Sequence, residues 1–177
     1  MNEESAMKIT MIAVAVLAAG CAHLGGGDGP KAVASLESTK GNTAKGSVTF
    51  TQQGDKVRVA ANLTGLKPGA EHGFHVHEKG DCSSGDGMSA GGHFNPATKP
   101  HGHHGAAERH AGDMPNVKAD DYGNASATFD VSGLSIGSGA ADVVGKGLIV
   151  HRDPDDYKSQ PAGNAGPRIA CAVIRKA

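Results

Sequence analysis

The 177-residue sequence contains no tryptophan, and aromatic residues make up only 3% of it. Glycine, by contrast, occurs 27 times. Glycine weakens helix interiors, so a chain this rich in it rarely builds long helices. No stretch shows the 3.6-residue periodicity of a long amphipathic helix. The composition therefore suits short strands joined by many turns better than a helical bundle.

An excess of charge of either sign is also missing. The formal net charge is −1 and the sequence pI is about 6.8. A protein that binds nucleic acid normally carries a basic patch or an acidic-basic asymmetry, and neither is present. We therefore expect no nucleic-acid partner. The length suits one domain with one ordinary hydrophobic core.

A long hydrophobic run is the third absence. The apolar run at 9–19 follows Lys8 and is too short for a bilayer, which needs about 20 apolar residues. It reads instead as a secretory signal. Ala18, Ala19 and Gly20 precede Cys21 as in a bacterial lipobox, in which the cysteine is acylated, although an ordinary leader cleaved nearby would also fit. Residues 1–6 carry two glutamates, whereas the first residues of such leaders are basic. Met7 is therefore an alternative translation start.

These features predict three segments: a lipoprotein signal peptide at 1–21 ending at lipidated Cys21, a glycine-rich tether at 22–30 and a folded domain at 31–177. The chain has three cysteines. With Cys21 used by lipid, Cys82 and Cys171 remain as a pair in an exported, oxidising setting, and we expect them to form a disulfide. Two unpaired buried thiols are the alternative.

From Lys31 onward, apolar residues recur at every second position, as in half-buried strands. Val48 and Phe50 alternate with polar residues, and the pattern resumes at 57–59 after a turn at 53–55, which predicts a hairpin. Further strand-like stretches lie at 126–131, 148–151 and 169–174. Short strands separated by turn sequences predict an antiparallel sandwich or barrel. Two polar intervals, 78–116 and 153–166, interrupt this rhythm and are long enough to be functional loops.

Ten histidines are the outlying number of the composition. In the strand-like segment HGFHVH, His75 and His77 share one face while Phe74 and Val76 share the other. Histidine is the commonest metal ligand. Two imidazoles on one face, opposite two core residues, are unusual and offer two nitrogen donors side by side.

The first long interval holds a complete ligand set for a tetrahedral zinc ion, formed by His93, His101, His110 and Asp113. His75 and His77 offer two further nitrogen donors, and His151, at the end of the strand-like LIVH, offers a third. One ordinary site cannot hold seven ligands. The sequence therefore predicts two metal ions.

The runs GFHVHEKGDC, GGHFNP, ERHAGD, LIVHRDPDD and GNAGPRIACAVI resemble the copper/zinc superoxide dismutase family in order and spacing, from about Lys31 to Ala177. The resemblance implies an all-β fold: an eight-stranded antiparallel Greek-key barrel, related to an immunoglobulin-like sandwich, with two long metal-site loops. It also implies one copper and one zinc per subunit. In HGFHVH, His75 and His77 would then face the copper outside the barrel, and Phe74 and Val76 would point into the barrel core.

The resemblance implies a ligand set for each metal. The copper ligands would be His75, His77, His93 and His151. The zinc ligands would be His93, His101, His110 and Asp113. His93 would therefore lie between the metals as a shared imidazolate.

Other matched residues would support the metals. Arg168 would dock the anionic substrate beside copper, and Asp155 would join His75 to His101. His72 matches a buried structural histidine, and Lys158 is a candidate for steering substrate. His103 and His104, beside His101, are expected to be solvent-facing neighbours or weak extra ligands.

The implied activity is disproportionation of superoxide to dioxygen and hydrogen peroxide, by a redox-cycling copper beside a structural zinc. A non-catalytic copper-binding or copper-buffering lipoprotein on the same fold is the alternative. The position of Cys82, the short second loop and the leader resemble the bacterial periplasmic branch. The expected location is the periplasm or cell envelope, with a lipid anchor as the only membrane contact, and the expected state is a monomer or homodimer.

Overall fold

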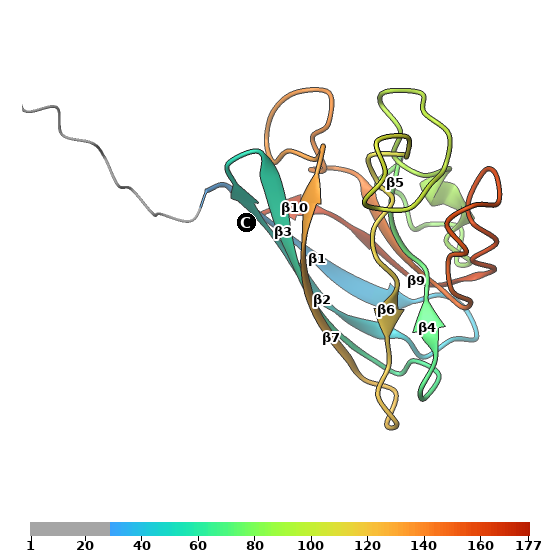
Figure 1. Cartoon of the computed structure of the whole chain (residues 1–177). Coiled ribbons are helices and arrows are strands. Elements are labelled where there is room, and N and C mark those ends of the chain that lie inside the picture. The colour runs from blue at the N-terminus through green and yellow to red at the C-terminus, as the bar shows by residue number, and fades with distance from the viewer. Residues whose placement is uncertain (1–28) are drawn as a thin grey trace, which may run out of the picture.

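A computed structural model describes residues 29–177 (Figure 1). The predicted signal peptide, lipidated Cys21 and almost all of the predicted tether lie outside these residues. Within 29–177, no helix has the length and apolar character needed to cross a membrane.

The described part of the chain is built from short strands and a single 3-10 turn, η1 (Met88–Ala90). The longer strands are β1 (Lys31–Ser38), β2 (Lys45–Gln53), β3 (Lys56–Thr64), β5 (Phe74–His77), β7 (Ala125–Ser132), β8 (Gly147–His151) and β9 (Arg168–Val173). The two-residue strands are β4 (Glu71–His72), β6 (Val117–Lys118) and β10 (Arg175–Lys176). The predicted hairpin is confirmed as β2–β3, and the stretches at 126–131, 148–151 and 169–174 correspond to β7, β8 and β9.

Alternating burial explains why these segments form strands around one core. In β1 every second residue from Ala32 to Leu36 is buried, and in β3 the same holds from Val57 to Leu63. Each such strand places its small or branched apolar side chains inward and its polar ones in solvent. Phe50 and Phe74 are the largest residues of this interior, and both are fully buried.

The sheet order confirms the Greek-key topology. Eight strands are joined in the order β5-β8-β9-β1-β2-β3-β7, with β10 paired to β1 off this path. All the ladders are antiparallel. Strands β1, β2 and β3 follow one another, and β9 returns from far along the chain to lie beside β1, which is the Greek-key arrangement. Strand β1 links the two halves, because it pairs with β2 over most of its length and with β9 at Glu37 and Ser38.

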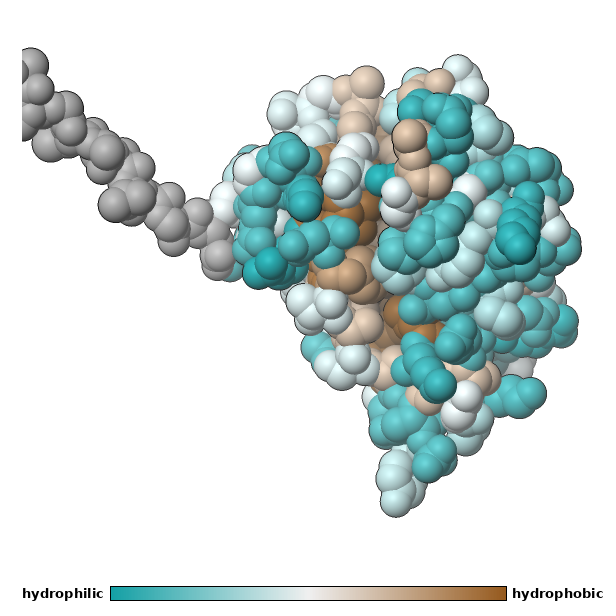
Figure 2. Space-filling view, in the orientation of Figure 1, coloured by the Kyte–Doolittle hydropathy of each residue, from teal (hydrophilic) through white to brown (hydrophobic). Residues whose placement is uncertain are grey.

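The barrel has a seam between its end strands, β5 and β7. The ladder path ends at these strands, and in the described residues no ladder joins them. The β4–β6 pair bridges this seam, since β4 leads into β5 and β6 precedes β7. In Figure 2, hydrophobic residues gather in a band between the β3–β7 side and the loop-bearing side, whose surface is mainly hydrophilic.

Strand β5 is buried on both faces, and this positions the functional site. Phe74 and Val76 belong to the main hydrophobic core. His75 and His77 point the other way and are covered by the loop that spans 78–116. The alternation predicted from HGFHVH is therefore confirmed.

A disulfide fixes the first part of this loop to the barrel. Cys82 and Cys171 are bonded with a sequence separation of 89, as the cysteine content predicted. Cys171 lies on β9 and packs with Ile149 and Ala90 in a small separate apolar cluster, against which Cys82 also packs. The segment containing η1 is thereby attached to the face of the barrel that carries the histidines.

Candidate metal centre

Two backbone bridges bring the loop residues to β5. His77 pairs with His93, and His75 pairs with Asp113, each in antiparallel register. His151 comes from the last residue of β8, the strand that pairs with β5 on its other edge. Residues far apart in the sequence are thus assembled around one short strand.

The seven residues predicted from the sequence form two groups whose ligand atoms lie within 4.8 Å of one another. All seven side chains are buried. The first group consists of His75, His77, His93 and His151. The second group consists of His93, His101, His110 and Asp113. His93 belongs to both.

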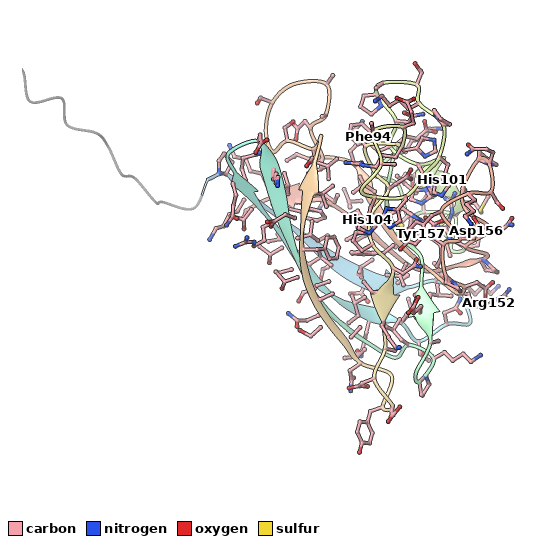
Figure 3. The ribbon with its side chains drawn as sticks, viewed as in Figure 1. Phe94, His101, His104, Arg152, Asp156 and Tyr157 are labelled. Carbon is pink, nitrogen blue, oxygen red and sulfur yellow. A yellow bond between two sulfur atoms is a disulfide. The ribbon has the colours of Figure 1, made fainter. Side chains whose placement is uncertain are left out.

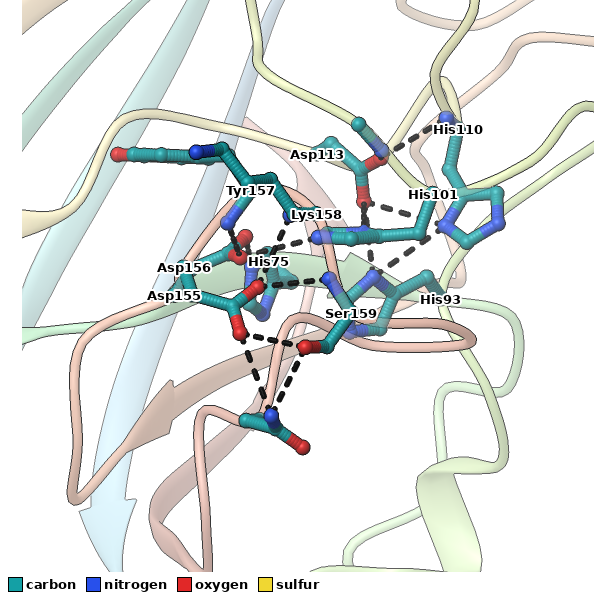
Figure 4. Close-up of polar contacts among 12 residues, drawn as sticks. His75, His93, His101, His110, Asp113, Asp155, Asp156, Tyr157, Lys158 and Ser159 are labelled. Carbon is teal, nitrogen blue, oxygen red and sulfur yellow. Dashed lines mark hydrogen bonds and ion pairs between the residues drawn. The ribbon is translucent and has the colours of Figure 1, made fainter.

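The second group has the dimensions of a tetrahedral metal site. Asp113 Oδ1 lies 2.8 Å from His93 Nδ1, 3.1 Å from His101 Nδ1 and 3.2 Å from His110 Nδ1 (Figure 4). Zinc binds such ligands at 2.0–2.1 Å, so tetrahedral ligand atoms lie about 3.3 Å apart. Three imidazoles and a carboxylate at this spacing fit a zinc ion.

The first group presents imidazole nitrogens only. His77 Nε2 lies 3.4 Å from His151 Nε2. The other ring nitrogen of each is fixed by the backbone, because His77 Nδ1 donates to the Gly91 carbonyl at 2.9 Å and His151 Nδ1 donates to the Gly166 carbonyl at 3.0 Å. The two Nε2 atoms are therefore turned toward the centre of the group. Imidazole is a good ligand for copper.

Unpartnered nitrogens support metal binding by both groups. In residues 29–177, four buried side-chain nitrogen or oxygen atoms lack a hydrogen-bond partner: His72 Nε2, His75 Nδ1, His93 Nε2 and His101 Nδ1. Buried polar atoms are nearly always hydrogen-bonded, because leaving one unpaired costs about 1–3 kcal/mol. Three of the four atoms belong to the two groups, where a metal ion would satisfy them.

Asp155 links the two groups a second time. Its carboxylate accepts from His75 Nε2 at 2.8 Å and from His101 Nε2 at 2.9 Å, as the family resemblance implied (Figure 4). The Asn116 side chain bonds both backbone polar groups of Asp155, and the Tyr157 N–H donates to Asp155 Oδ1. The carboxylate thus accepts three hydrogen bonds, from His75, His101 and the Tyr157 N–H, while Asn116 fixes the backbone of Asp155.

Gly163 makes room for this bridge. Its φ is +66°, and a Cβ at this position would collide with Asp155 Oδ1 and with the His101 ring. Any side chain at position 163 would therefore be strained by the backbone and would displace the carboxylate.

Arg168 lies beside the first group. Its guanidinium donates to the carbonyls of Gly87 and Gly91, each at 2.6 Å, and the Gly91 carbonyl also accepts from His77. Arg168 and His151 line a cavity of about 260 Å³ together with Met88 and residues 160–162 and 164–167 of the second loop. A half-buried cation therefore lies at the opening that leads to the first group.

Burial and neighbouring charges adjust the pKa values of these residues. Burial, assisted by nearby imidazoles, lowers the pKa of His93 to about 4 and that of His151 to about 3. The pKa of His77 is lowered well below its ordinary value, by burial and then by His93 and His151. These three histidines are therefore neutral near pH 7, which is the form that binds metals.

The second group behaves differently because it contains the Asp113 carboxylate and contacts that of Asp155. Burial opposes protonation of His101, but the nearby carboxylates of Asp113 and Asp155 outweigh this and raise its pKa to about 9. Burial likewise opposes ionisation of the two carboxyls, yet their histidine partners hold both pKa values well below the usual range. A metal ion entering this group displaces a proton from His101.

The remaining predicted residues are placed as follows. His72 is buried and its Nδ1 donates to the His151 carbonyl, which agrees with a structural role. Lys158 is exposed on the second loop, and its steering role stays a prediction. The sequence alone did not identify the carbonyls of Gly87 and Gly91 or the contacts of Asn116 and Tyr157, because backbone acceptors and cross-loop amides leave no residue-type pattern.

Comparisons with known proteins agree with this site. The family model described as copper/zinc superoxide dismutase matches residues 44–174. The chain is 43% identical over 149 residues to Cu-Zn superoxide dismutase 2 of Aquifex aeolicus, covering 82% of this chain and 86% of the relative. It is 42% identical over 136 residues to the Cu-Zn superoxide dismutase of Paramecium bursaria Chlorella virus 1, covering 73% and 72%. The crystal structure of the clock protein EA4 is similar with a TM-score of 0.75 and 42% identity, covering 82% and 93%.

Proposed function

Because the chain belongs to the copper/zinc superoxide dismutase family, we propose a specific role for each residue of its two histidine groups. The activity is the disproportionation of superoxide to dioxygen and hydrogen peroxide, with copper and zinc as cofactors. The observation that supports the residue roles best is the shared His93, whose Nδ1 faces the carboxylate-containing group while its buried Nε2 has no hydrogen-bond partner.

Copper is assigned to the group of four imidazoles, and zinc to the group with the carboxylate. A closed tetrahedral set, with no position left open, suits a structural zinc, and histidine and aspartate are both zinc ligands. The all-histidine group lies beside the cavity lined by His151 and Arg168, where a small substrate can reach it. When bound, copper supplies one-electron transfer in both directions, which zinc cannot.

Arg168 is proposed to bind the superoxide anion. Its guanidinium keeps a positive charge at every working pH and is held in place by the Gly87 and Gly91 carbonyls. A fixed cation at the opening raises the encounter rate with a small anion, and salt weakens this effect.

His93 is proposed to carry a proton as well as to bind metal. Its Nδ1 is held on the zinc side next to Asp113, while its Nε2 points to the copper side. His93 Nε2 would hold a proton for the reduced substrate whenever it is not bound to a metal, and the contact of Nδ1 with Asp113 would keep the ring in position.

A non-catalytic copper-buffering protein is the alternative function. The test is to load the purified protein with both metals, verify one copper and one zinc per chain, and measure superoxide removal by pulse radiolysis. We expect fast removal that is lost in His77→Ala. A fully loaded protein without dismutase activity would favour copper buffering.

We further propose that the chain is a lipoprotein of the bacterial cell envelope, anchored at Cys21, with residues 22–30 as the tether. The support is sequence evidence alone: the apolar run at 9–19 and the lipobox-like residues before Cys21. Cys21→Ser should release the protein from the membrane fraction, whereas Cys82→Ser should not. Membrane attachment of the Cys21→Ser variant would contradict the anchor. Sedimentation of the released protein distinguishes a monomer from a homodimer.

A further inference from the structure

One side chain of the second loop holds the backbone of a zinc-side ligand. Gln160 Nε2 donates to the His101 carbonyl at 2.8 Å, and Gln160 Oε1 accepts from the His101 N–H at 2.9 Å. A longer bond of 3.4 Å joins Gln160 Nε2 to the Lys158 carbonyl. Gln160 is exposed, so each of its bonds to His101 replaces one that water could supply. The effect of these bonds is therefore to fix the two loops relative to each other.

The second loop contains a compact unit, residues 156–164, to which this glutamine belongs. The Asp156 carboxylate accepts from the Ser159 N–H at 2.8 Å, from the Ser159 hydroxyl at 2.6 Å and from the Asn164 side chain at 3.2 Å (Figure 4). The Gly163 N–H donates to the Ser159 carbonyl at 2.7 Å. These bonds lie within the unit and hold it together, so fixing one of its residues positions the rest.

The unit is attached to the first loop at separate points. Near its start, the Tyr157 hydroxyl accepts from the Asn116 N–H, and the adjacent Asp155 carboxylate accepts from the His101 ring. Figure 3 shows Tyr157 and His101 on the same side of the barrel. Further along the unit, Gln160 bonds to the His101 backbone. A rigid body held at one point can rotate, whereas a second point prevents this, so Gln160 supplies the restraint against rotation.

The same unit forms one wall of the cavity beside the copper-side group. Gln160, Pro161 and Ala162 line this cavity of about 260 Å³ together with His151 and Arg168. His151 is a copper-side ligand, and Arg168 is the residue proposed to bind superoxide. The position of the wall therefore sets the width of the opening through which an anion approaches. Gln160 lies in this wall while its amide holds the zinc-side loop.

We propose that Gln160 is a positioning residue that couples the zinc group to the opening beside the copper-side group. Its amide joins the wall of the opening to the backbone of His101, so an ion that fixes His101 also fixes the wall. Both bonds go to the backbone of His101 and not to its ring, so Gln160 acts through His101 rather than as a ligand. The proposal rests on the assignment of zinc to the second group and adds a consequence for substrate access.

The first experiment measures access to copper with azide, a small anion whose binding to Cu²⁺ changes the visible absorption. Azide dissociation constants are compared in protein loaded with copper alone and with copper and zinc. We expect zinc to tighten azide binding in the parent, and this effect to be about 2–10-fold smaller in Gln160→Met, which keeps the side-chain length and removes both hydrogen bonds. Gln53→Met on β2 is the matched control and should retain the parent's zinc effect. An equal zinc effect in the parent and in Gln160→Met overturns the proposal.

The second experiment measures the wall itself by hydrogen exchange with mass spectrometry. Zinc should slow amide exchange in residues 158–167 of the parent and slow it less in Gln160→Met. Gln160→Glu keeps the acceptor and loses the donor, so it should be intermediate. Exchange that zinc slows equally in all three proteins overturns the coupling.

The failure of this proposal can be distinguished from the failure of the proposed function. Zinc that is retained at one per chain in His101→Ala would contradict the zinc assignment, and the proposal with it. Neither experiment uses superoxide. Coupling observed in a protein without dismutase activity would therefore contradict the proposed function alone.

Discussion

His93 is the residue on which both metal groups depend. Its two ring nitrogens face different groups, and its side chain is almost fully buried between them. His77, by comparison, belongs to the copper-side group only, with its second nitrogen bonded to a backbone carbonyl. Substituting each histidine in turn therefore distinguishes a residue that serves both groups from a residue that serves one.

We predict that His93→Ala lowers both copper and zinc occupancy, whereas His77→Ala lowers copper and leaves zinc near one per chain. The reason is that the first change removes a ligand from each set and the second from one. Metal analysis by mass spectrometry checks this. Normal occupancy of both metals in His93→Ala would contradict the shared-ligand assignment.

Arg168 combines a charge with a positioning role, since it also ties down the Gly87 and Gly91 carbonyls. We predict that Arg168→Ala keeps both metals and lowers the second-order rate constant at least about tenfold, with a weaker salt dependence, because the docking cation is lost. Arg168→Lys should keep part of the rate, since the charge remains but not the forked geometry. Pulse radiolysis at several ionic strengths measures these values. An unchanged Cu²⁺ EPR spectrum is the control that His77 has not moved.

At the scale of elements, one strand and two loops make the site. The alternation in β5 and the motifs around the histidines allowed the fold class and the seven residues of the two groups to be predicted, because strand periodicity and the metal-binding side chains can be identified from the residue types. Other features could not be predicted this way. The seam between β5 and β7 depends on ladder geometry, and the support of Arg168 comes from carbonyls, which every residue possesses.

The disulfide is the element-scale feature with the clearest energetic consequence. It closes a loop with a sequence separation of 89 and holds the segment around η1, whose flanking glycine carbonyls bind Arg168. We predict that Cys82→Ser/Cys171→Ser lowers the free energy of unfolding by about 4–5 kcal/mol, from loop-closure entropy, and also lowers the dismutase rate. Chemical unfolding and activity assays of the fully metal-loaded variant check both effects. A stability loss with full activity would show that the carbonyls hold Arg168 without the disulfide.

For the molecule as a whole, stability without metals should depend on pH in two opposite ways. His93 and His151 have pKa values of about 4 and 3 in the fold but about 6.5 when unfolded, so the unfolded chain takes up protons first as the pH falls. Their contribution is present above about pH 6.5 and is lost toward pH 3–4. His101, with a folded pKa of about 9, contributes below about pH 6.5 and loses this as the pH rises through 9.

We therefore predict that the melting temperature of the metal-free protein is highest near pH 6–7 and falls on both sides. Calorimetry across pH 4–10 on chelator-treated protein provides the measurement. His101→Gln should remove the decline on the alkaline side and leave the acid side in place. An alkaline decline that persists in this variant would contradict the role of His101.

Two physical connections, the His93 ring and the Asp155 carboxylate, join the copper and zinc groups, and this makes the two binding equilibria thermodynamically linked. Each ion would order residues that the other also needs, so we predict that the cooperativity is positive. Linkage requires the factor by which zinc tightens copper to equal the factor by which copper tightens zinc. Asp155→Asn breaks one connection without removing a ligand. We predict that it weakens zinc binding about 10–100-fold and reduces both coupling factors by the same amount. Competitive chelator titrations of each metal, with and without the other, measure the two factors, and coupling factors that stay unchanged in Asp155→Asn would contradict the role of Asp155 as a connection.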